Sequence, residues 1–296
     1  MKVAIVGANS FLASYIINKI KSDFDLMLYG QFQIDSFNFK SFIFPDKKID
    51  FEELLDFDVI IYTAGAGIQN DLKESKSNIY TLNTFYPIEL VNFLREKSYK
   101  GKFISFGSYF EIGDEPLLKY YDESDIMLAN NPVPNDYCIS KRLLTKYLSS
   151  VYDSFKYYHF IISNLYGPGE NKNRLIPYLI NSLKNDREIK LTSGHQVRQY
   201  IHAKDVAQVV HNFINNNFKP GLYNITVETP IKVKDLVKTV FKVMEKENLL
   251  KVEMFGKSIR TDVKMPYLLL TTDKLKAEAG FKTQINIESG IKSYLL

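Results

Sequence analysis

The chain has 296 residues, enough for one large domain or two unequal lobes around a buried core. Hydrophobic residues make up 45% and charged residues 24%, as in ordinary globular proteins, and the lack of an apolar run of about 18 residues argues against a membrane-spanning helix. The net charge of +4 is mild and spread along the chain, which argues against nucleic acid as a partner.

Short apolar runs that alternate with helical patterns predict an α/β protein. The runs predict strands at Lys2–Val6, Asp25–Tyr29, Val59–Thr63, Lys102–Phe106 and Tyr158–Ile162, with a further candidate at Ile189–Leu191. Apolar residues at helical spacing predict helices over Phe11–Ser22, Asn78–Lys97 and Tyr137–Ser154. We therefore expect a doubly wound parallel sheet of the Rossmann type, covered by helices on both faces.

The pattern changes after about Gly167, where loops lengthen and Pro and Asn become more frequent. Helices are predicted there over Leu175–Lys184, Ala203–Asn215 and Val233–Glu247. We expect residues 1–165 to form the sheet domain, joined by a returning segment at about 195–220, and residues 166–296 to form mainly a smaller C-terminal lobe. Because ligands of doubly wound folds bind at the carboxyl edge of the sheet, this lobe is expected to close over that edge and bind substrate.

The turn between the first strand and the first helix predicts nucleotide binding. In MKVAIVGANSFLAS, Gly7 follows the strand and the helix begins near Ser10. Such a turn places a cofactor diphosphate at the helix N-terminus, where free N–H groups and the helix dipole favour anions. Only the first of the three usual glycines is present, since Ser10 and Ala13 occupy the other positions, so a strand-turn-helix without ligand is the alternative. The candidate cofactor ligands in this turn are Gly7, Asn9, Ser10, Phe11 and Leu12.

The ends of two further predicted strands indicate which cofactor is bound and where the backbone approaches it. NAD-binding folds usually carry an acidic residue at the end of the second strand, but LMLYGQ has none and Tyr29 lies in that region. Because no negative charge there repels a 2′-phosphate, we expect NADP, with NAD as the alternative. Asp46 is a candidate adenine contact or a turn residue. After VIIYT, Ala64, Gly65 and Ala66 either let the backbone pass close to the cofactor or form a tight turn.

Tyr137 and Lys141 are the candidate catalytic pair. They stand four residues apart at the start of an amphipathic helix and so share one face. A nearby ammonium lowers the pKa of a phenol, which lets Tyr137 exchange a proton with an alcohol or carbonyl, and Lys141 can also hold a cofactor ribose. Ser108, just past a predicted strand, is placed to hydrogen-bond a substrate oxygen. Asn83 either holds a water in a proton chain or fixes the helix backbone.

Taken together, these residues resemble the extended short-chain dehydrogenase/reductase family of nucleotide-sugar epimerases, dehydratases and reductases. The resemblance covers essentially the whole chain and includes, in order, the Gly7 turn, Ala64-Gly65, Asn83, Ser108, Tyr137 with Lys141, LYGPGE at 165–170 and VRQYIHAKDVA at 197–207. It implies an NAD(P)-dependent oxidoreductase. In it, Tyr137 is the proton donor, Lys141 lowers the pKa of Tyr137 and binds the ribose, and Ser108 orients the carbonyl.

The resemblance also implies that the substrate is a nucleotide-diphosphate sugar. Asn164 resembles the asparagine that contacts the sugar nucleotide in this family. Arg198 resembles the arginine that binds the diphosphate, a task suited to its planar set of donors. Arg260 is a candidate second phosphate ligand, and Tyr109 a candidate substrate contact beside Ser108. The alternatives are a turn asparagine and solvent-exposed arginines.

The residues after Ser108 distinguish the reactions of the family. Sugar 4,6-dehydratases carry an acid pair there, whereas this chain has Tyr109 and Phe110, which disfavours a dehydratase. Fucose-type enzymes use a Cys and a His for 3,5-epimerisation, at positions where this chain has Phe110 and Gly169. Ile161 stands where the family often has an arginine, which makes the resemblance looser without removing a catalytic group.

Two reactions remain. One is NAD(P)H-dependent reduction of a 4-keto-6-deoxy sugar nucleotide, in deoxysugar biosynthesis for surface polysaccharide. The other is 4-epimerisation with a tightly bound NAD. The uncharged end of the second strand and the missing glycines favour the reductase. A non-catalytic cofactor-binding sensor or scaffold is an alternative of another class, against which the joint presence of Ser108, Tyr137, Lys141 and Arg198 argues.

The sequence also leads to expectations about the cellular compartment, metal binding and the oligomeric state. Cys138 is the one cysteine, and the apolar run that follows Met1 lacks the features of a signal peptide, so we expect a cytoplasmic protein without disulfides. His195 and His202 have no metal-ligand spacing, so no metal is expected. Family members usually pair through the helices predicted at 78–97 and 137–154, which implies a homodimer. Leu144, Tyr147 and Leu148 serve either that contact or the core.

Overall fold

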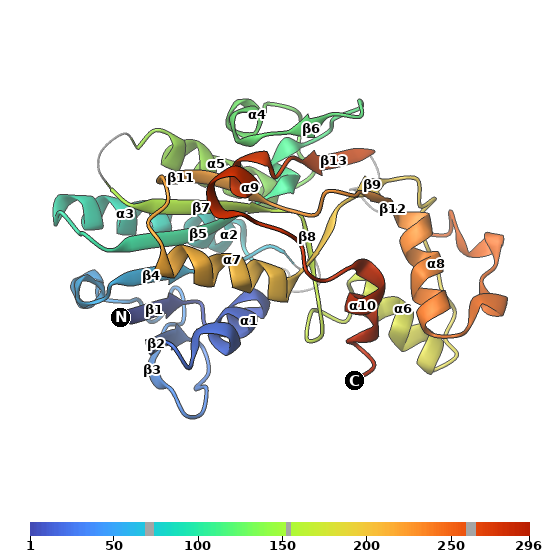
Figure 1. Ribbon diagram of the computed structural model, residues 1–296, viewed down its shortest axis with the longest axis horizontal. Coiled ribbons are helices and arrows are strands. Elements are labelled where there is room, and N and C mark those ends of the chain that lie inside the picture. Colours follow the sequence, from blue (N-terminus) through green and yellow to red (C-terminus); the bar gives the residue numbers. More distant parts are fainter. Residues whose placement is uncertain (69–73, 152–154, 259–264) are drawn as a thin grey trace.

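The computed structural model describes residues 1–68, 74–151, 155–258 and 265–296 (Figure 1). Its described part contains a seven-stranded parallel sheet in the order β11-β7-β5-β4-β1-β2-β3. The strands are β1 (Lys2–Val6), β2 (Asp25–Gly30), β3 (Asn38–Ser41), β4 (Val59–Tyr62), β5 (Lys102–Ser108), β7 (Tyr157–Ile162) and β11 (Gly221–Ile225). The chain builds outward from β1 to β3 and then crosses back to place β4 on the other side of β1. This reversal confirms the doubly wound fold, in which ligands bind at the carboxyl ends of the strands where the order reverses, here β1 and β4.

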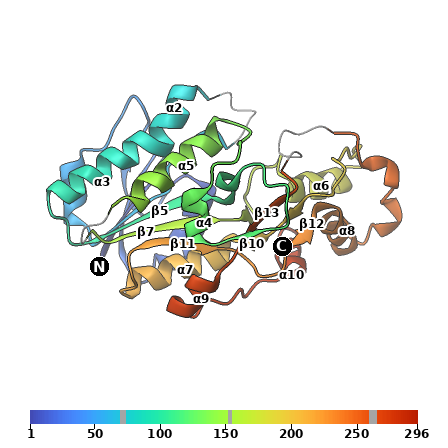
Figure 2. The ribbon, with the colours of Figure 1, turned by 90° about the horizontal axis from the view of Figure 1, so that it is seen from above.

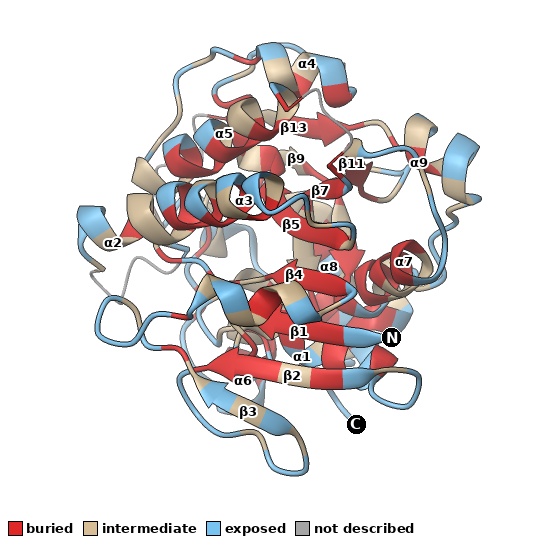
Figure 3. Cartoon of the chain, turned by 90° about the vertical axis from the view of Figure 1, so that its left-hand side faces the viewer, coloured by how far each residue is buried: buried red, intermediate tan, exposed pale blue. Residues whose placement is uncertain are grey.

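Helices cover both faces of the sheet, which is why its strands are buried and read as nearly continuous apolar runs. Helices α1 (Phe11–Ile20) and α7 (Ala203–Asn215) pack together on one face. Helices α2 (Lys76–Tyr80), α3 (Tyr86–Glu96) and α5 (Asp136–Ser149) lie on the other (Figure 2). The buried side of each layer faces the strands, whereas the outer sides of the helices are exposed (Figure 3).

A smaller lobe follows β8 (Asn164–Tyr166) and has an apolar core of its own. It is built by α6 (Leu175–Lys184), α8 (Val233–Val243) and α10 (Ile287–Lys292), which gather at one end of the molecule (Figure 1). Between them the chain returns to the sheet through β10 (Tyr200–His202), α7 and β11, so the returning segment extends to Ile225. The division of the chain into a sheet domain and a substrate-binding lobe stays a prediction.

Short elements connect these parts. A second sheet has the order β12-β9-β13-β6. The remaining elements are η1 (Phe51–Asp56), η3 (Thr81–Phe85), η4 (Tyr109–Ile112), β6 (Tyr120–Tyr121), α4 (Glu123–Leu128), β9 (Val197–Arg198), β12 (Ile231–Lys232), η5 (Glu247–Leu249), η6 (Val252–Met254), β13 (Tyr267–Leu270) and α9 (Asp273–Ala279). Among the described residues, no helix has both the length and the apolar character needed to cross a bilayer, and no cluster of side chains suits a metal ion.

Most predicted elements are confirmed, with shifts at their ends. The strand predicted at Ile189–Leu191 is wrong, because this run is irregular and contributes its apolar side chains to the core of the small lobe. The helix predicted over Asn78–Lys97 is interrupted at Thr81–Phe85 by a π-helical segment. The helix predicted to reach Glu247 ends at Val243, since Glu245 has a left-handed φ of 54°.

A buried histidine joins β5, β7 and α5 beneath the carboxyl edge of the sheet. His159 Nδ1 shares a hydrogen bond of 2.8 Å with the Ser105 hydroxyl, and Nε2 shares one of 2.9 Å with the Thr145 hydroxyl. The side chain is fully buried, and burial, assisted by the nearby Lys141, lowers its pKa to about 3. The imidazole is therefore neutral in the folded protein at every pH near neutrality.

This low pKa predicts that His159 makes stability depend on pH. The unfolded chain takes up a proton at this histidine near its ordinary pKa of 6.5, whereas the folded protein does so only near pH 3. The stabilisation is therefore complete above pH 6.5 and is lost as the pH falls toward 3, by up to about 1.4 kcal/mol per pH unit. Urea unfolding at several pH values should show this slope in wild type relative to H159Q. The substitution H195Q, at an exposed position, is the matched control, and an equal pH slope in wild type and H159Q would contradict the account.

Candidate active site

The ends of β1 and β4 meet in a contact that leaves no room for a side chain. Gly7 has a φ of 90°, and a Cβ built on it would lie 2.4 Å from the backbone nitrogen of Ala64. The Ala64 N–H donates to the Val6 carbonyl (3.0 Å), and the Thr63 hydroxyl lies within hydrogen-bonding distance of the Val6 and Gly7 carbonyls (2.9 and 3.0 Å). Glycine is required at this position by both its φ and its surroundings.

Helix α1 begins directly after this contact. The Ser10 N–H donates to the Gly7 carbonyl (3.0 Å), and the Ser10 hydroxyl caps the helix by accepting from Ala13 N–H (3.2 Å). Phe11 and Leu12 form the first turn and are partly buried. A tight glycine turn that leads into a capped helix fits the diphosphate of a dinucleotide cofactor, because it presents N–H groups and the positive end of the helix dipole.

The end of β2 is arranged around Asn9 instead of an acidic residue. Asn9 Oδ1 accepts from the N–H groups of Gln31 (2.6 Å) and Phe32 (3.0 Å), and Nδ2 donates to the Phe32 carbonyl (2.9 Å). A Cβ on Gly30 would lie 2.3 Å from that Oδ1. The side chain of Asn9 thus fills the space that a larger residue at position 30 would need. Its neutral amide leaves this strand end without a carboxylate.

Two candidate cofactor residues near β2 have other visible roles. The Tyr29 side chain is buried in the core, and its carbonyl accepts from the N–H groups of Gly7 and Ala8, both at 2.9 Å. Asp46 is exposed in a turn closed by reciprocal backbone hydrogen bonds between Ile43 and Lys47. Contacts of either residue with a cofactor stay predictions.

Asn83 fastens the segment after β4 to α5. It lies in the π-helical segment, is fully buried, and pairs with the backbone of Ala66 through Oδ1 (2.9 Å) and Nδ2 (2.8 Å). Its Nδ2 also donates to the Ser140 hydroxyl (2.9 Å). The backbone that Asn83 fixes is that of Ala66, next to the exposed Gly65, and not that of its own helix, while the predicted role in a proton chain stays a prediction.

Ser108 and Tyr137 face each other across the same edge. Ser108 is the last residue of β5, and Tyr137 lies in the first turn of α5, which Asn135 caps by accepting from Cys138 N–H (3.0 Å). Burial raises the pKa of the Tyr137 phenol above its ordinary value, whereas the Ser108 hydroxyl and the Arg174 guanidinium lower it. At neutral pH the phenol is protonated, as a proton donor must be.

Lys141 lies one turn further along α5 and is buried. Its ammonium donates to the Phe106 carbonyl of β5 (2.9 Å), and a Cβ on Gly65 would lie 3.9 Å from the same nitrogen. Burial lowers the pKa of Lys141 to about 8, an effect that the charge of Glu111 opposes. The predicted lowering of the Tyr137 pKa by Lys141 stays a prediction, since the ammonium is bonded to β5 here.

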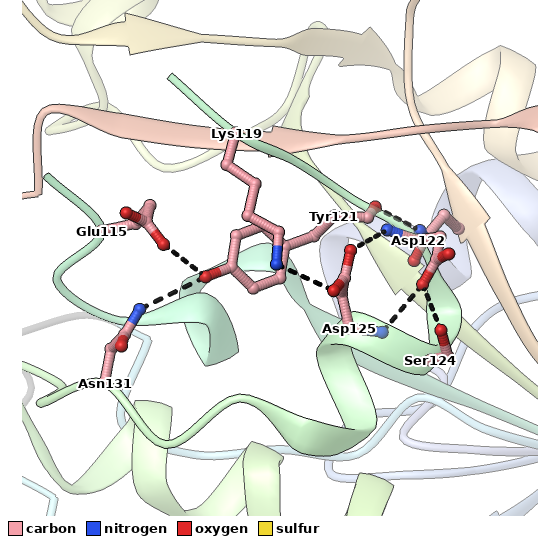
Figure 4. A network of polar contacts seen from close by, with 8 residues as sticks. Glu115, Lys119, Tyr121, Asp122, Ser124, Asp125 and Asn131 are labelled. Carbon is pink, nitrogen blue, oxygen red and sulfur yellow. Dashed lines mark hydrogen bonds and ion pairs between the residues drawn. The ribbon is translucent and has the colours of Figure 1, made fainter. Parts of the chain in front are cut away.

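A network of polar contacts lies within the segment that connects Ser108 to Tyr137 (Figure 4). The Tyr121 hydroxyl donates to Glu115 (2.6 Å) and accepts from Asn131 (3.3 Å). Lys119 lies over the Tyr121 ring, 4.4 Å from its centroid, and pairs with Asp125 (2.8 Å). These contacts tie three separate parts of the connection together.

The candidate substrate residues have mixed placements. Asn164 is partly exposed at the start of β8, directly after the carboxyl end of β7. Arg198 is buried and donates to the carbonyls of Val197 (2.9 Å) and Met265 (2.7 Å), so it holds β9 against the segment before β13. The Tyr109 ring is buried in an apolar cluster. Arg260 lies outside the described residues. Roles for all four in substrate binding stay predictions.

Three residues near the site were missed by the sequence analysis. Glu111 accepts from the Ser108 N–H, His159 of β7 bonds to Ser105 of the neighbouring β5, and Arg174 influences Tyr137 from the start of α6. The spacing Ser108-x-x-Glu111 is that of a capping box, a signal that the sequence does contain. Nothing in the local sequence marks His159 or Arg174, because their roles arise from tertiary contacts.

Comparison with known proteins identifies the family. The model of the NAD dependent epimerase/dehydratase family matches residues 3–226. CDP-abequose synthase of Salmonella muenchen is 23% identical, over 99% of this chain and 97% of the relative. Human dTDP-D-glucose 4,6-dehydratase is 25% identical, over 83% of this chain and 75% of the relative.

Solved structures share the fold over the full chain. UDP-glucose 4-epimerase of Thermotoga maritima, solved with UDP-glucose, has a TM-score of 0.82 at 16% identity and covers 100% of this chain and 98% of its own. UDP-glucose 4-epimerase of Thermus thermophilus, solved with NAD, has a TM-score of 0.80 at 15% identity, with coverages of 100% and 98%. Because the family model matches most of the chain, this protein belongs to the NAD dependent epimerase/dehydratase family.

Proposed function

We propose that this protein modifies nucleotide sugars, and that its reaction is the NAD(P)H-dependent reduction of a 4-keto-6-deoxy sugar nucleotide. The observation that carries the proposal is the gathering of Ser108, Tyr137 and Lys141 at the carboxyl edge, beside the Gly7–Ala64 contact. The nucleotide sugars in the names of relatives and in solved neighbours support the substrate class. Such a reaction fits deoxysugar biosynthesis for surface polysaccharide.

The proposed roles follow from the environment of each side chain. A bound nicotinamide cofactor supplies the hydride. Tyr137, protonated at neutral pH, donates a proton to the carbonyl oxygen, and Ser108 hydrogen-bonds the same oxygen and orients it. The turn from Gly7 to Leu12 is proposed to hold the diphosphate. Lys141, next to Gly65, is proposed to bind the ribose through the donors that its ammonium has besides the one bonded to the Phe106 carbonyl.

The surroundings of Ser108 argue against dehydration, although dehydratases are among the relatives. Loss of water across two carbons needs an acid and a base beside the sugar. Tyr109 and Phe110 follow Ser108, and the Tyr109 ring is buried in the apolar cluster. Glu111 is also fully buried and bonded to the backbone of Ser108, so it is not placed to reach a substrate.

The second candidate is 4-epimerisation with a tightly bound NAD. The likeness to 4-epimerases solved with UDP-glucose and with NAD favours it. The uncharged end of β2 around Asn9, and the single glycine of the first turn, support the reductase. For the cofactor we propose NADP, supported by the neutral Asn9 amide at the end of β2, where a carboxylate would repel a 2′-phosphate. NAD, present in the solved neighbours, is the alternative.

Removing the Tyr137 hydroxyl tests the proposal. Tyr137→Phe should lower turnover by about 100-fold or more, the usual contribution of a general acid, and leave cofactor affinity nearly unchanged. The assay follows oxidation of NADPH and NADH with CDP-, dTDP-, GDP- and UDP-linked 4-keto-6-deoxy sugars. Tyr99→Phe, which removes a phenol at the opposite edge of the sheet, is the matched control.

Each outcome of this assay separates the candidates. Isomerisation of a sugar nucleotide without added cofactor would favour the epimerase. Cofactor binding without turnover of any sugar nucleotide would favour the sensor or scaffold. Full activity in Tyr137→Phe would contradict the proposed role of the phenol.

We also propose a homodimer formed through α3 and α5. Leu144 and Leu148 belong to the core, so they do not serve this contact. The exposed side chains of Phe85, Ile139 and Leu143 instead supply an apolar surface around the same pair of helices. Exposed apolar groups that share one face are typical of interfaces.

Placing a charge on this surface tests the dimer. Leu143→Asp should convert a dimer into a monomer of 34.3 kDa, measured by analytical ultracentrifugation, because an unpaired charge in an apolar interface opposes association. Leu128→Asp changes an equally apolar but more exposed residue on α4 and should leave the mass unchanged. A monomeric wild-type protein would contradict the proposal.

A further inference from the structure

Glu111 is a fully buried carboxyl group directly beneath Ser108. It lies in η4, immediately after β5, and its Oε1 accepts from the Ser108 N–H at 2.7 Å. In return the Ser108 hydroxyl accepts from the Phe110 N–H at 3.3 Å, which completes a capping box. The carboxyl group thus fixes the backbone of the residue proposed to orient the substrate carbonyl.

The same carboxyl group lies tightly against β5. A Cβ on Gly107 would lie 2.6 Å from Glu111 Oε1 and 2.8 Å from His159 Nε2. Among the described residues, Glu111 Oε2 makes no hydrogen bond of good geometry, since the nearby Thr145 hydroxyl pairs with His159 Nε2. A buried carboxylate oxygen without a partner is costly, and a capping role alone is fulfilled by Oε1. Capping of η4 therefore does not explain why a charged carboxyl group is buried at position 111.

Two cations of α5 lie near the carboxyl group: Glu111 Oε1 is bonded to the N–H of Ser108 and the Lys141 ammonium to the carbonyl of Phe106, so the two charged groups bond to β5 on either side of Gly107. Arg142 Nε donates to the Glu111 carbonyl (2.8 Å), and the Lys141 ammonium is buried against the Phe106 carbonyl (2.9 Å). Burial raises the pKa of the Glu111 carboxyl to about 7, whereas the Thr145 hydroxyl, the Ser108 N–H, Lys141 and Arg142 lower it. Conversely, burial lowers the pKa of Lys141 and the charge of Glu111 raises it.

The other titratable groups near the Glu111 carboxyl group are uncharged at neutral pH. Burial raises the pKa of both the Tyr137 phenol and the Cys138 thiol, and the charge of Glu111 raises them further. His159 is neutral and bonded to Ser105 and Thr145. Glu111 is thus the anionic group that favours the charged form of Lys141 and the protonated form of Tyr137.

We propose that Glu111 is a positioning residue of the active site, which anchors Ser108 and supplies the buried negative charge that keeps Lys141 an ammonium. The catalytic meaning of this inference rests on the proposed function, whereas the coupling between the two charges does not. Protonation of Glu111 removes the counter-charge of Lys141.

The substitution Glu111→Gln isolates the charge, because the amide oxygen still accepts from Ser108 N–H and the volume is nearly the same. In wild type and variant, the pKa of Lys141 is measured by NMR of protein with isotope-labelled lysine, its signal assigned with Lys141→Met. The expected result is a fall of about one pKa unit or more in the variant, the usual effect of losing a nearby opposite charge. An unchanged Lys141 pKa would overturn the proposal.

Glu123→Gln is the matched control. Glu123 is also buried and accepts from a backbone N–H, that of Asn224 at 2.7 Å, but its charge acts on Lys274 and not on the active site. This variant should leave the Lys141 pKa at its wild-type value. An equal fall in Glu123→Gln and Glu111→Gln would show a general effect of structural loosening and overturn the specific pairing.

The reverse experiment does not depend on the folding of Glu111→Gln. In Lys141→Met, the carboxyl pKa of Glu111, read by NMR of isotope-labelled glutamate, should rise by an amount similar to the fall of Lys141, because coupling between two sites is reciprocal. No rise would overturn the proposal.

If the proposed function holds, the pH profile of kcat also shifts in Glu111→Gln. Absence of any turnover in wild type contradicts the proposed function alone and leaves the two NMR results to decide the coupling.

Discussion

The arrangement of the candidate active site depends on one buried contact, between the Lys141 ammonium and the Phe106 carbonyl. It joins α5 to β5, so it sets the position of Tyr137, one turn earlier on the helix, relative to Ser108, two residues further along the strand. A buried cation is tolerated only with partners, and here the carbonyl and the charge of Glu111 provide them. Asn83 adds a second connection, from the end of β4 to α5. Strand ends that would otherwise be independent are thereby held as one unit.

The fold was predictable to the extent that it depends on hydrophobic periodicity. Parallel strands buried on both faces appear in the sequence as apolar runs, so the central strands and most helices were found. The edge strand β3 was missed because it is short and half exposed, and the apolar run at Ile189–Leu191 was misread because a lobe core produces the same signal as a strand. The π-helical interruption around Asn83 has no local signature, since it reflects contacts with Ala66 and Ser140.

The site was predictable where residue types recur at fixed spacing. Gly7, Ser108, Tyr137 and Lys141 are found together at one edge of the sheet because parallel strands deliver their carboxyl ends to the same side. Tertiary roles were not predictable. Arg198, expected to be a phosphate ligand, donates to the backbone carbonyls of Pro266 and Met265 in a distant segment, and Arg174 affects Tyr137 from another lobe. Glu111 lies between these cases, since its capping-box spacing was visible but its burial and its electrostatic influence on Lys141 were not.

The most direct test of the account follows the hydrogen that the site is proposed to transfer. The protein is incubated with a 4-keto-6-deoxy sugar nucleotide and with NADPH or NADH carrying deuterium in both positions at C4 of the nicotinamide, and the product is examined by mass spectrometry and NMR. The account predicts one deuterium in the product, bonded to C4 of the sugar. A reduced sugar without deuterium, or bound cofactor that keeps all its label while the ketone is untouched, would contradict it.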